Sequence, residues 1–351
     1  MNMGIDDLHA ANLTKFEASK SLKLPKFLIL RFSSIGDIVL TSPVVRCLNE
    51  QVRDAEVHFL TKKSYASVLM HHPQIDKLWT TDGSLDDVMD SLQAEKFDYI
   101  IDLHNNLRSI KIKRKLKVKN FSFRKLNIQK WMLVNLHINK MPPIHIVDRY
   151  METLQKFKVK NDQKGLDFYS EPGAENVLSK LPATHQHGFV AIAIGAQHTT
   201  KMMPSDKIVR VIRALKYPVV LLGGKEDKIR SKQIEMGAME NVWNACGQFS
   251  LGESAQIVKA AKVVLTHDTG LMHIAAAFQK PIVSVWGNTV PEFGMTPYLP
   301  QNKNLSKIME VKNLPCRPCS KIGYDRCPKG HFNCMSGIDN TDIVNAIKSF
   351  L

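Results

Sequence analysis

The chain has 351 residues, of which 44% are hydrophobic and 23% charged, a balance typical of a folded globular protein with room for two domains. No apolar run is long enough to cross a bilayer, and residues 1–24 lack the apolar core of a secretory signal, so we expect a cytoplasmic protein with a polar N-terminal tail. The 48 Lys and Arg residues outnumber the 33 Asp and Glu residues, and the resulting charge of +15 favours anionic partners.

The first half of the chain alternates strand and helix patterns. Apolar and β-branched runs predict strands over residues 26–32, 55–61 and 97–104. Helical spacing predicts helices over 38–52, with Pro43 in its first two turns, and near 64–70. This alternation is typical of βαβ units in a parallel sheet that is covered on both faces. We therefore expect a Rossmann-like domain over residues 25–170, followed by a linker over 168–187.

The turn after the first strand reads Ser33-Ser34-Ile35-Gly36-Asp37. It lacks the G-x-G-x-x-G pattern of a dinucleotide site, and a carboxylate at this point would repel phosphate. The first domain is therefore not expected to bind a nucleotide. Asp37 has two interpretations: it caps the following helix, or it acts as a general base at the edge of a cleft.

A long basic stretch follows the strand at 97–104. Between Asp102 and Asp148 there is no Asp or Glu. The same interval contains eleven basic residues: Arg108, Lys111, Lys113, Arg114, Lys115, Lys117, Lys119, Arg124, Lys125, Lys130 and Lys140. Charge of one sign attracts polyanions such as nucleic acid, anionic lipid or a phosphorylated glycolipid, although a solvated surface has the same pattern.

The strand and helix alternation restarts in the second half. Strands are predicted over residues 188–196, 218–224, 241–247, 262–268 and 281–287, and helices over 204–216, 225–236, 250–261 and 269–278. Pro204 would stand in the first turn of its helix, where a missing N–H costs nothing. We expect a second Rossmann-like domain over 185–335 and a C-terminal helix over 336–351. Two facing sheets of this kind place a ligand cleft between the carboxyl ends of their strands.

The turn after the strand at 262–268 is the candidate anion site. Asp268 can cap the helix there, with Thr269 and Gly270 in the first turn. Gly270 allows a close approach to the backbone, and the free N–H groups suit a diphosphate. His273, one turn further along, either reaches a phosphate or packs in the core.

Two further loops would reach the same cleft. Lys201 stands just before Pro204 and can neutralise a phosphate as a point charge, or it is one more surface lysine. After Gly224 come Glu226 and Asp227, and a carboxylate past a strand end is the usual partner of ribose hydroxyls. The pattern does not choose between these two acids.

Several segments resemble glycosyltransferase family 9, the ADP-heptose:lipopolysaccharide heptosyltransferases. They are "RFSSIGDIVLTSPVV" near the start, the K-x-x-P of Lys201–Pro204, the GG-x-E of Gly223–Glu226 and "HDTGLMHIAAA". The segment "IHIVDRY", with Arg149 and Tyr150, is also similar to the family. The resemblance covers roughly residues 25 to 350.

The resemblance implies a GT-B fold, two Rossmann-like domains with parallel sheets facing a central cleft, and an inverting, metal-independent transfer without a required cofactor. It implies that Asp37 is the catalytic base and that Lys201 contacts the phosphates of an ADP-sugar donor. With the loops described above, we expect the donor-binding residues to be Gly195, Thr199, Thr200, Lys201, Glu226, Asp268, Thr269, Gly270 and His273. We expect the acceptor-binding residues to be Ser34 and Gly36, with His104, Asn105 and Arg108, which lie at the carboxyl end of the strand at 97–104.

The implied acceptor is an anionic glycolipid, lipid A carrying acidic core sugars, reached by peripheral contact with the anionic inner-membrane face. The basic stretch then provides surface attraction. Two rival hypotheses remain: a sugar-nucleotide epimerase of similar architecture, and a nucleic-acid-binding protein. The second is not expected, because the nearest aromatic residues, Phe121, Phe123 and Trp131, lie beyond the densest charges.

Four of the six cysteines lie close together in the sequence: Cys316, Cys319, Cys327 and Cys334. Their spacing is compatible with a structural zinc site, with His331 as an alternative fourth ligand. Thiols that pack in a loop without binding a metal are the alternative. Disulfides are disfavoured in a reducing cytosol.

Overall fold

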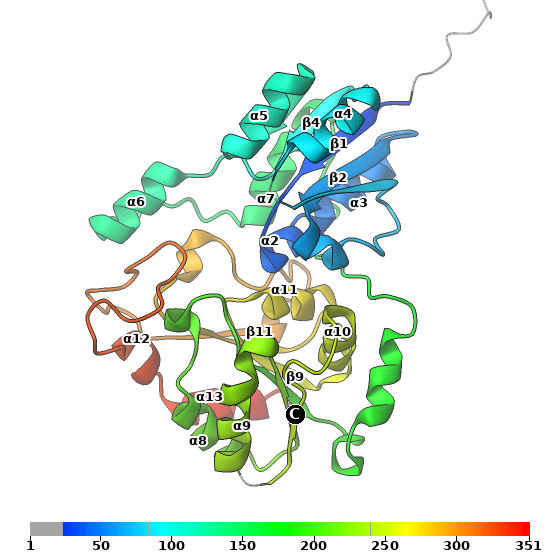
Figure 1. The fold of residues 1–351 in the computed structure, drawn as a ribbon. Coiled ribbons are helices and arrows are strands. Elements are labelled where there is room, and N and C mark those ends of the chain that lie inside the picture. The colour runs from blue at the N-terminus through cyan, green and yellow to red at the C-terminus, as the bar shows by residue number, and fades with distance from the viewer. Residues whose placement is uncertain (1–23, 83, 239) are drawn as a thin grey trace, which may run out of the picture.

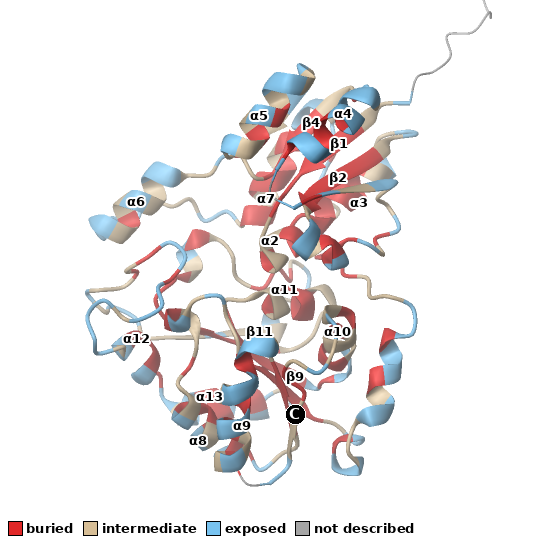
Figure 2. Ribbon diagram, viewed as in Figure 1, coloured by how far each residue is buried: buried red, intermediate tan, exposed pale blue. Residues whose placement is uncertain are grey.

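The computed structural model describes residues 24–82, 84–238 and 240–351, so the tail predicted over 1–24 lies, apart from Leu24, outside the described residues. The described chain forms two lobes, each built around one parallel sheet (Figure 1). Both sheets are buried between helices, and their strands form the most deeply buried part of each lobe (Figure 2). None of the helices described combines the length and apolarity needed to cross a bilayer.

The N-terminal sheet has the order β3-β2-β1-β4-β5, and all neighbouring strands are parallel. Its strands are β1 Lys26–Leu30, β2 Glu56–Lys62, β3 Lys77–Thr81, β4 Tyr99–Asp102 and β5 Lys119–Ser122. β1, β2 and β4 coincide with predicted strands, whereas the edge strands β3 and β5 were missed. The carboxyl ends of β1 and β4 lie side by side, with Leu30 paired to Asp102.

The helix predicted over 38–52 is wrong in its bounds, because it is divided into two helices. The helices of this lobe are α2 Ile35–Val39, α3 Ser42–Gln51, α4 Asp86–Ala94, α5 Leu107–Leu116, α6 Asn127–Asn135 and α7 Ile146–Met151. Pro43, at the start of α3, has no N–H to donate to the preceding turn. The hydroxyls of Thr41 and Ser42 donate instead to the carbonyls of Ile38 and Val39, at 2.6 and 2.8 Å. The helix predicted near 64–70 is a 3₁₀ segment, Lys63–Val68.

The C-terminal sheet has the order β11-β10-β9-β6-β7-β8. Its strands are β6 Val190–Ala193, β7 Val219–Leu222, β8 Val242–Asn244, β9 Val263–His267, β10 Ile282–Trp286 and β11 Ser306–Glu310. The helices are α8 Ser205–Leu215, α9 Lys228–Ala238, α10 Leu251–Ala260, α11 Gly270–Ala277, α12 Asn333–Ser336 and α13 Asn340–Lys348. The edge strand β11 and the short helix α12 were missed from the sequence. Pro204 precedes α8 as its N-cap, and the last helix, α13, packs against α8, β10 and β11.

The segment predicted as a linker, 168–187, is packed and not free. Phe168 and Val177 are buried, and the 3₁₀ segment Ala174–Lys180 contacts α10. Just before it, Asp162 forms two contacts with the Arg46 guanidinium of α3, at 2.7 and 2.9 Å. Asp167 pairs with the same guanidinium. These ion pairs fix the start of the crossing between the lobes.

The remaining short 3₁₀ segments lie mostly in loops. They are Glu152–Phe157, Ala183–His185, Thr199–Lys201, Lys225–Asp227, Pro291–Phe293 and Lys303–Leu305. Two of them, Thr199–Lys201 and Lys225–Asp227, follow β6 and β7 directly and bring predicted site residues to the carboxyl edge of the sheet.

Candidate active site

The turn that begins α2 and the turn that begins α11 lie against each other where the lobes meet (Figure 1). A Cβ on Gly36 would lie 2.6 Å from Cδ2 of His273 and 3.4 Å from Cα of Gly270. A Cβ on Gly270 would lie 2.7 Å from Cγ2 of Ile35. Each turn therefore needs its glycine so that the other turn can approach. The two motifs that the sequence singled out occupy one place in the fold.

Asp37 is the third residue of α2, and Ser34 holds the N-cap position. The prediction that Asp37 is the N-cap residue is therefore wrong. Its side chain nevertheless takes part in the cap, as the third residue of a capping box. Its Oδ2 accepts hydrogen bonds from the backbone N–H of Ser34 at 3.2 Å and from the Ser34 hydroxyl at 3.0 Å. The carboxylate stays 21% exposed at the junction of the lobes. It can therefore meet a substrate while its orientation is fixed.

Arg31 fixes the other oxygen of Asp37. Its Nη2 lies 2.7 Å from Oδ1 of Asp37. The guanidinium also donates to the carbonyls of Ser33 and Leu103 and to the hydroxyl of Tyr150, at 2.8, 2.6 and 2.9 Å. Burial acts to raise the pKa of Asp37, but Arg31 and the Ser34 hydrogen bonds outweigh it and hold that pKa below its usual value. Asp37 is therefore an ionised proton acceptor at neutral pH.

Lys201 faces the same junction from the C-terminal lobe. Its Nζ lies 2.6 Å from Oδ2 of Asp268, and the hydroxyl of Thr289 donates to the same oxygen at 3.1 Å. The prediction that Asp268 caps α11 is wrong, because its carboxylate makes these contacts and Thr269 is the N-cap residue. The Thr269 side chain forms no capping hydrogen bond. The first N–H groups of α11 thus receive no hydrogen bond acceptor from the N-cap side chain, so they suit an anionic ligand.

His273 lies on α11 one turn after Gly270 and is only 2% exposed. Burial lowers its pKa to about 4, so the ring is neutral at pH 7. Its Cδ2 edge packs toward Gly36, and within the described chain its Nδ1 has no hydrogen-bond partner. His273 is thus packed in the core, as one of its two interpretations predicts, and its Nδ1 is still able to form a hydrogen bond.

The acids after β7 differ sharply in their surroundings. Asp227 is 4% exposed, accepts a hydrogen bond from the N–H of Gly224 at 2.9 Å and packs against Gly195 and Gly223. Burial raises its pKa. Glu226 is exposed. Asp227 thus supports the two strand ends, and Glu226 is the acid whose carboxylate is accessible.

The two threonines before Lys201 also differ in their exposure. Thr200 is buried, and its hydroxyl donates to the carbonyl of Tyr324 at 3.0 Å and accepts from the Tyr324 N–H at 2.8 Å. Thr199 is exposed. Thr200 therefore anchors the loop, and Thr199 is the one whose hydroxyl is accessible.

The loop after β4 is organised by the fully buried Asp102. Its Oδ1 accepts from the N–H groups of His104 and Asn105, at 3.1 and 2.7 Å. The amide of Asn105 donates to the carbonyl of Phe123 at 3.3 Å. Burial lowers the pKa of His104 to about 4. Arg108 stands in the first turn of α5, partly exposed.

Part of the basic stretch is neutralised locally. Lys113 forms an ion pair of 2.8 Å with buried Asp102, and Lys111 and Lys115 lie 3.3 and 3.4 Å from Asp86. The densest part of the run is therefore less available to polyanions than the sequence indicated.

Two cations at the junction were not assigned a role from the sequence. Arg149 is 2% exposed, and its Nη2 donates to the carbonyl of Phe293 at 3.1 Å, while its Nε and Nη1 have no partner within the described chain. Burial, and next the charge of Arg149, lower the pKa of Lys130 to about 8. The charge of Asp37 also acts on Lys130. The "IHIVDRY" segment was the sequence signal for Arg149; Lys130 was only one of eleven basic residues.

The late cysteines do not form a compact ligand set. Among the described residues, one group of three potential metal ligands has its ligand atoms within 4.8 Å of one another. It consists of Glu56, His58 and Glu95 and contains no cysteine. All four cysteines are free thiols, and Sγ of Cys316 lies 3.7 Å from Nε2 of His331. The zinc site therefore stays a prediction from spacing.

The group of Glu56, His58 and Glu95 is an ion-pair network. Lys26 lies 3.0 Å from Glu56 and 2.8 Å from Glu95, and Lys77 lies 2.6 Å from Glu95. These lysines already neutralise the carboxylates.

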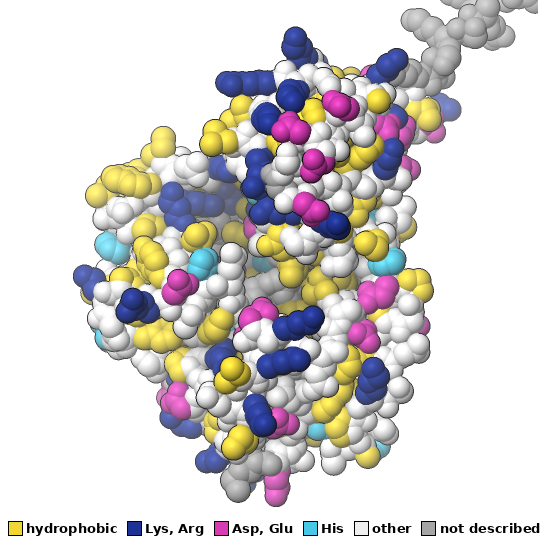
Figure 3. Space-filling model, viewed as in Figure 1, with side chains coloured by type: hydrophobic (Ala, Val, Ile, Leu, Met, Phe, Trp, Pro, Cys, Tyr) yellow, Lys and Arg dark blue, Asp and Glu magenta, His cyan; other side chains and the backbone are white. Residues whose placement is uncertain are grey.

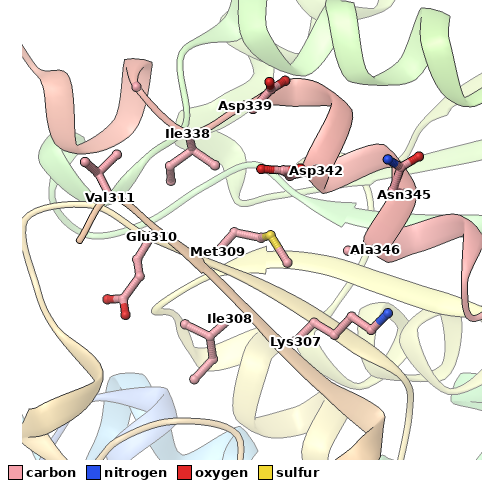
Figure 4. Close-up of a pocket in the computed structure, with 11 residues that line it drawn as sticks. Lys307, Ile308, Met309, Glu310, Val311, Ile338, Asp339, Asp342, Asn345 and Ala346 are labelled. Carbon is pink, nitrogen blue, oxygen red and sulfur yellow. The ribbon is translucent and has the colours of Figure 1, made fainter.

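A groove of about 570 Å³ lies between β11 and α13 (Figure 4). Its charged side chains are Lys307, Glu310, Asp339 and Asp342. None of the predicted site residues lines it. The Asp37 and Gly270 turns meet instead at the junction of the lobes, and a hollow between the lobes is visible in Figure 3.

Comparisons with known proteins agree with the two-lobed fold. The family model for glycosyltransferase family 9 (heptosyltransferase) matches residues 87–324. Lipopolysaccharide heptosyltransferase 1 of Campylobacter coli is 25% identical over 352 residues, covering 92% of this chain and 98% of the relative. Among solved structures, the glycosyltransferase family 9 protein of Veillonella parvula superposes with a TM-score of 0.75 at 21% identity, covering 93% of this chain and 97% of that one. The ADP-heptose lipopolysaccharide heptosyltransferase II of E. coli superposes with a TM-score of 0.70 at 19% identity, covering 93% and 98%.

Proposed function

The chain belongs to glycosyltransferase family 9, and we propose that it transfers heptose from ADP-heptose to a hydroxyl group of the lipopolysaccharide inner core. The observation that carries this proposal is the apposition of the Asp37 turn with the N-terminus of α11 and Lys201. One side of the junction offers a proton acceptor, and the other offers groups that suit a diphosphate. The names of the relatives support the donor and the acceptor class.

In the proposed reaction, Asp37 takes the proton of the acceptor hydroxyl as its oxygen attacks the anomeric carbon of the heptose. The bond from that carbon to the phosphate oxygen breaks, and ADP leaves with the electron pair. Attack from the face opposite the ADP inverts the anomeric configuration. The low pKa of Asp37 keeps it ionised, and its contacts with Arg31 and Ser34 fix its direction.

Lys201 and the first N–H groups of α11 stabilise the departing ADP, whose negative charge grows in the transition state. Since these groups supply positive potential, we propose that the transfer requires no divalent metal. In this proposal Glu226 and Thr199, whose side chains are exposed, bind the ribose and the phosphates. Buried Thr200 and Asp227 stabilise the two loops through their hydrogen bonds to Tyr324 and Gly224.

Arg149 and Lys130 support an acidic acceptor. A buried guanidinium with two unpartnered nitrogens is costly unless an anion binds it. Carboxylates or phosphates of lipid A and its acidic core sugars have the required charge. Because such a glycolipid resides in a membrane, we propose that the enzyme works peripherally at the anionic inner-membrane face.

The test is a donor panel with the purified protein. ADP-heptose, UDP-sugars and GDP-sugars are compared by calorimetry, and transfer is followed by ADP release and by the mass of the acceptor, with and without EDTA. We expect ADP-heptose alone to bind tightly and to add one heptose per acceptor, equally in EDTA. Binding of a UDP- or GDP-sugar in its place would refute the donor assignment, and isomerisation of the sugar nucleotide without acceptor would identify an epimerase.

A further inference from the structure

Helix α6 stands apart from the N-terminal sheet, at the rim of the hollow between the lobes (Figures 1 and 2). One of its faces is occupied. Leu133 is buried against Val290 and Phe293 of the C-terminal lobe. Lys130 faces the junction, where the charges of Arg149 and Asp37 act on it. The inner face of α6 thus belongs to the site described above.

The outer face of α6 is apolar and uncovered. Ile128 is 72% exposed, and Trp131, one turn further along, is 50% exposed. Leu136 and Ile138 continue the surface after the helix, at 49% and 43%. Figure 3 shows hydrophobic side chains gathered over this part of the molecule. A helix whose exposed face carries Ile and Trp, in a protein with its own packed core, is unusual unless something covers it.

The charge around this face indicates what covers it. No Asp or Glu occurs between Asp102 and Asp148, and the exposed Arg124 and Lys140 flank the helix. A second copy of the chain would bring like charges together, which is unfavourable at an interface. A tryptophan beside an apolar helix face with basic flanks is typical of helices that lie in the headgroup region of an anionic bilayer.

We propose that the outer face of α6, together with Leu136 and Ile138, docks the enzyme on an anionic lipid bilayer. Ile128 and Trp131 enter the boundary between headgroups and acyl chains, and the flanking basic residues contact the anionic headgroups. Lys130 on the opposite face then lies on the path from the bilayer to Asp37. This inference rests on the proposed function, because it supposes a lipid-anchored acceptor.

The experiment uses the full chain and vesicles of phosphatidylcholine with or without about 30% phosphatidylglycerol, since the attraction depends on anionic lipid. The test variant is Ile128→Ser/Trp131→Ser. The matched control is Ile229→Ser/Met236→Ser on α9, where the native side chains are 79% and 71% exposed. We expect co-sedimentation of the wild type with the anionic vesicles only, a loss of about tenfold or more in the test variant, and no change in the control.

A second measurement separates this inference from the proposed function. Transfer to a de-acylated, water-soluble acceptor should be equal in the wild type and in both variants, because none of the substituted residues contacts the junction. Equal vesicle binding by the wild type and the test variant, or association of the wild type with itself through this face in place of vesicle binding, would overturn the docking surface while transfer stays intact. Absence of transfer to the soluble acceptor in the wild type would instead refute the proposed function.

Discussion

Replacing Asp37 by Asn tests the catalytic assignment with almost no change of shape. The amide can still accept hydrogen bonds from Ser34, but it cannot take a proton. General-base catalysis contributes about 10²- to 10⁴-fold, which at 1.36 kcal/mol per tenfold corresponds to about 2.7–5.4 kcal/mol in the activation barrier. We expect kcat to fall by that factor, while the affinity for ADP-heptose stays within about twofold because Asp37 lies in the other lobe.

The same substitution removes the ion pair of Asp37 with Arg31. Breaking a buried pair costs about 3–5 kcal/mol of stability when one charge is left alone. Arg31 keeps its hydrogen bonds to Ser33, Leu103 and Tyr150, so we expect a smaller loss in the free energy of unfolding, about 1–3 kcal/mol. The variant should remain folded, and this is checked by urea denaturation.

The matched control is Asp162→Asn, which breaks a similar pair with Arg46 away from the junction. Turnover is measured by ADP release at saturating donor and acceptor, and donor affinity by calorimetry. The control should lose stability and keep its kcat. Turnover of Asp37→Asn within threefold of the wild type, or an equal loss of kcat in both variants, would refute the role of Asp37 as a base.

Three further predictions follow from the contacts. Lys201→Ala should weaken ADP-heptose binding and reduce kcat together, each by about tenfold or more, whereas Lys225→Ala should change neither; unchanged calorimetry for Lys201→Ala would remove it from the site. Lys130 has a pKa of about 8, so it is charged below that pH and neutral above it: the acceptor KM should rise from pH 7 to pH 9 with kcat nearly constant, and Lys130→Gln should start from the higher KM and lose the pH dependence. Arg46→Met leaves the carboxylates of Asp162 and Asp167 without their cation and should cost about 3–5 kcal/mol in urea denaturation without loss of turnover; an unchanged denaturation midpoint would contradict it.

The strands that line the site could be predicted from sequence because they are buried on both faces. β1, β6, β7 and β9 are continuous apolar runs between turn residues, which is the strongest pattern a single sequence offers. The edge strands were missed for the opposite reason. β3 and β11 contain many partly exposed positions and therefore lack a continuous apolar run. The sequence thus located the two turns that meet at the junction of the lobes, while it left both sheets incomplete.

The ion pairs of Asp37 and Asp268 could not be predicted, because their partners lie outside the helices that these residues begin. Asp268 forms an ion pair with Lys201, which lies on another loop, and does not cap α11. Asp37 forms a capping box with Ser34 and an ion pair with Arg31. The capping box could be inferred from helix rules, but the ion pair could not. Local patterns specify which side chains stand at a helix start; the tertiary ion pairs decide what those side chains bind.

The single glycine in each turn follows from the way the lobes meet. A nucleotide-binding turn uses several glycines because a pyrophosphate must approach its backbone, but the α2 turn is approached by the α11 turn. One glycine at position 36 makes room for His273, and Gly270 makes room for Ile35. In the proposed reaction the diphosphate binds at the start of α11 in the other lobe, which keeps the carboxylate of Asp37 on the acceptor side of the junction.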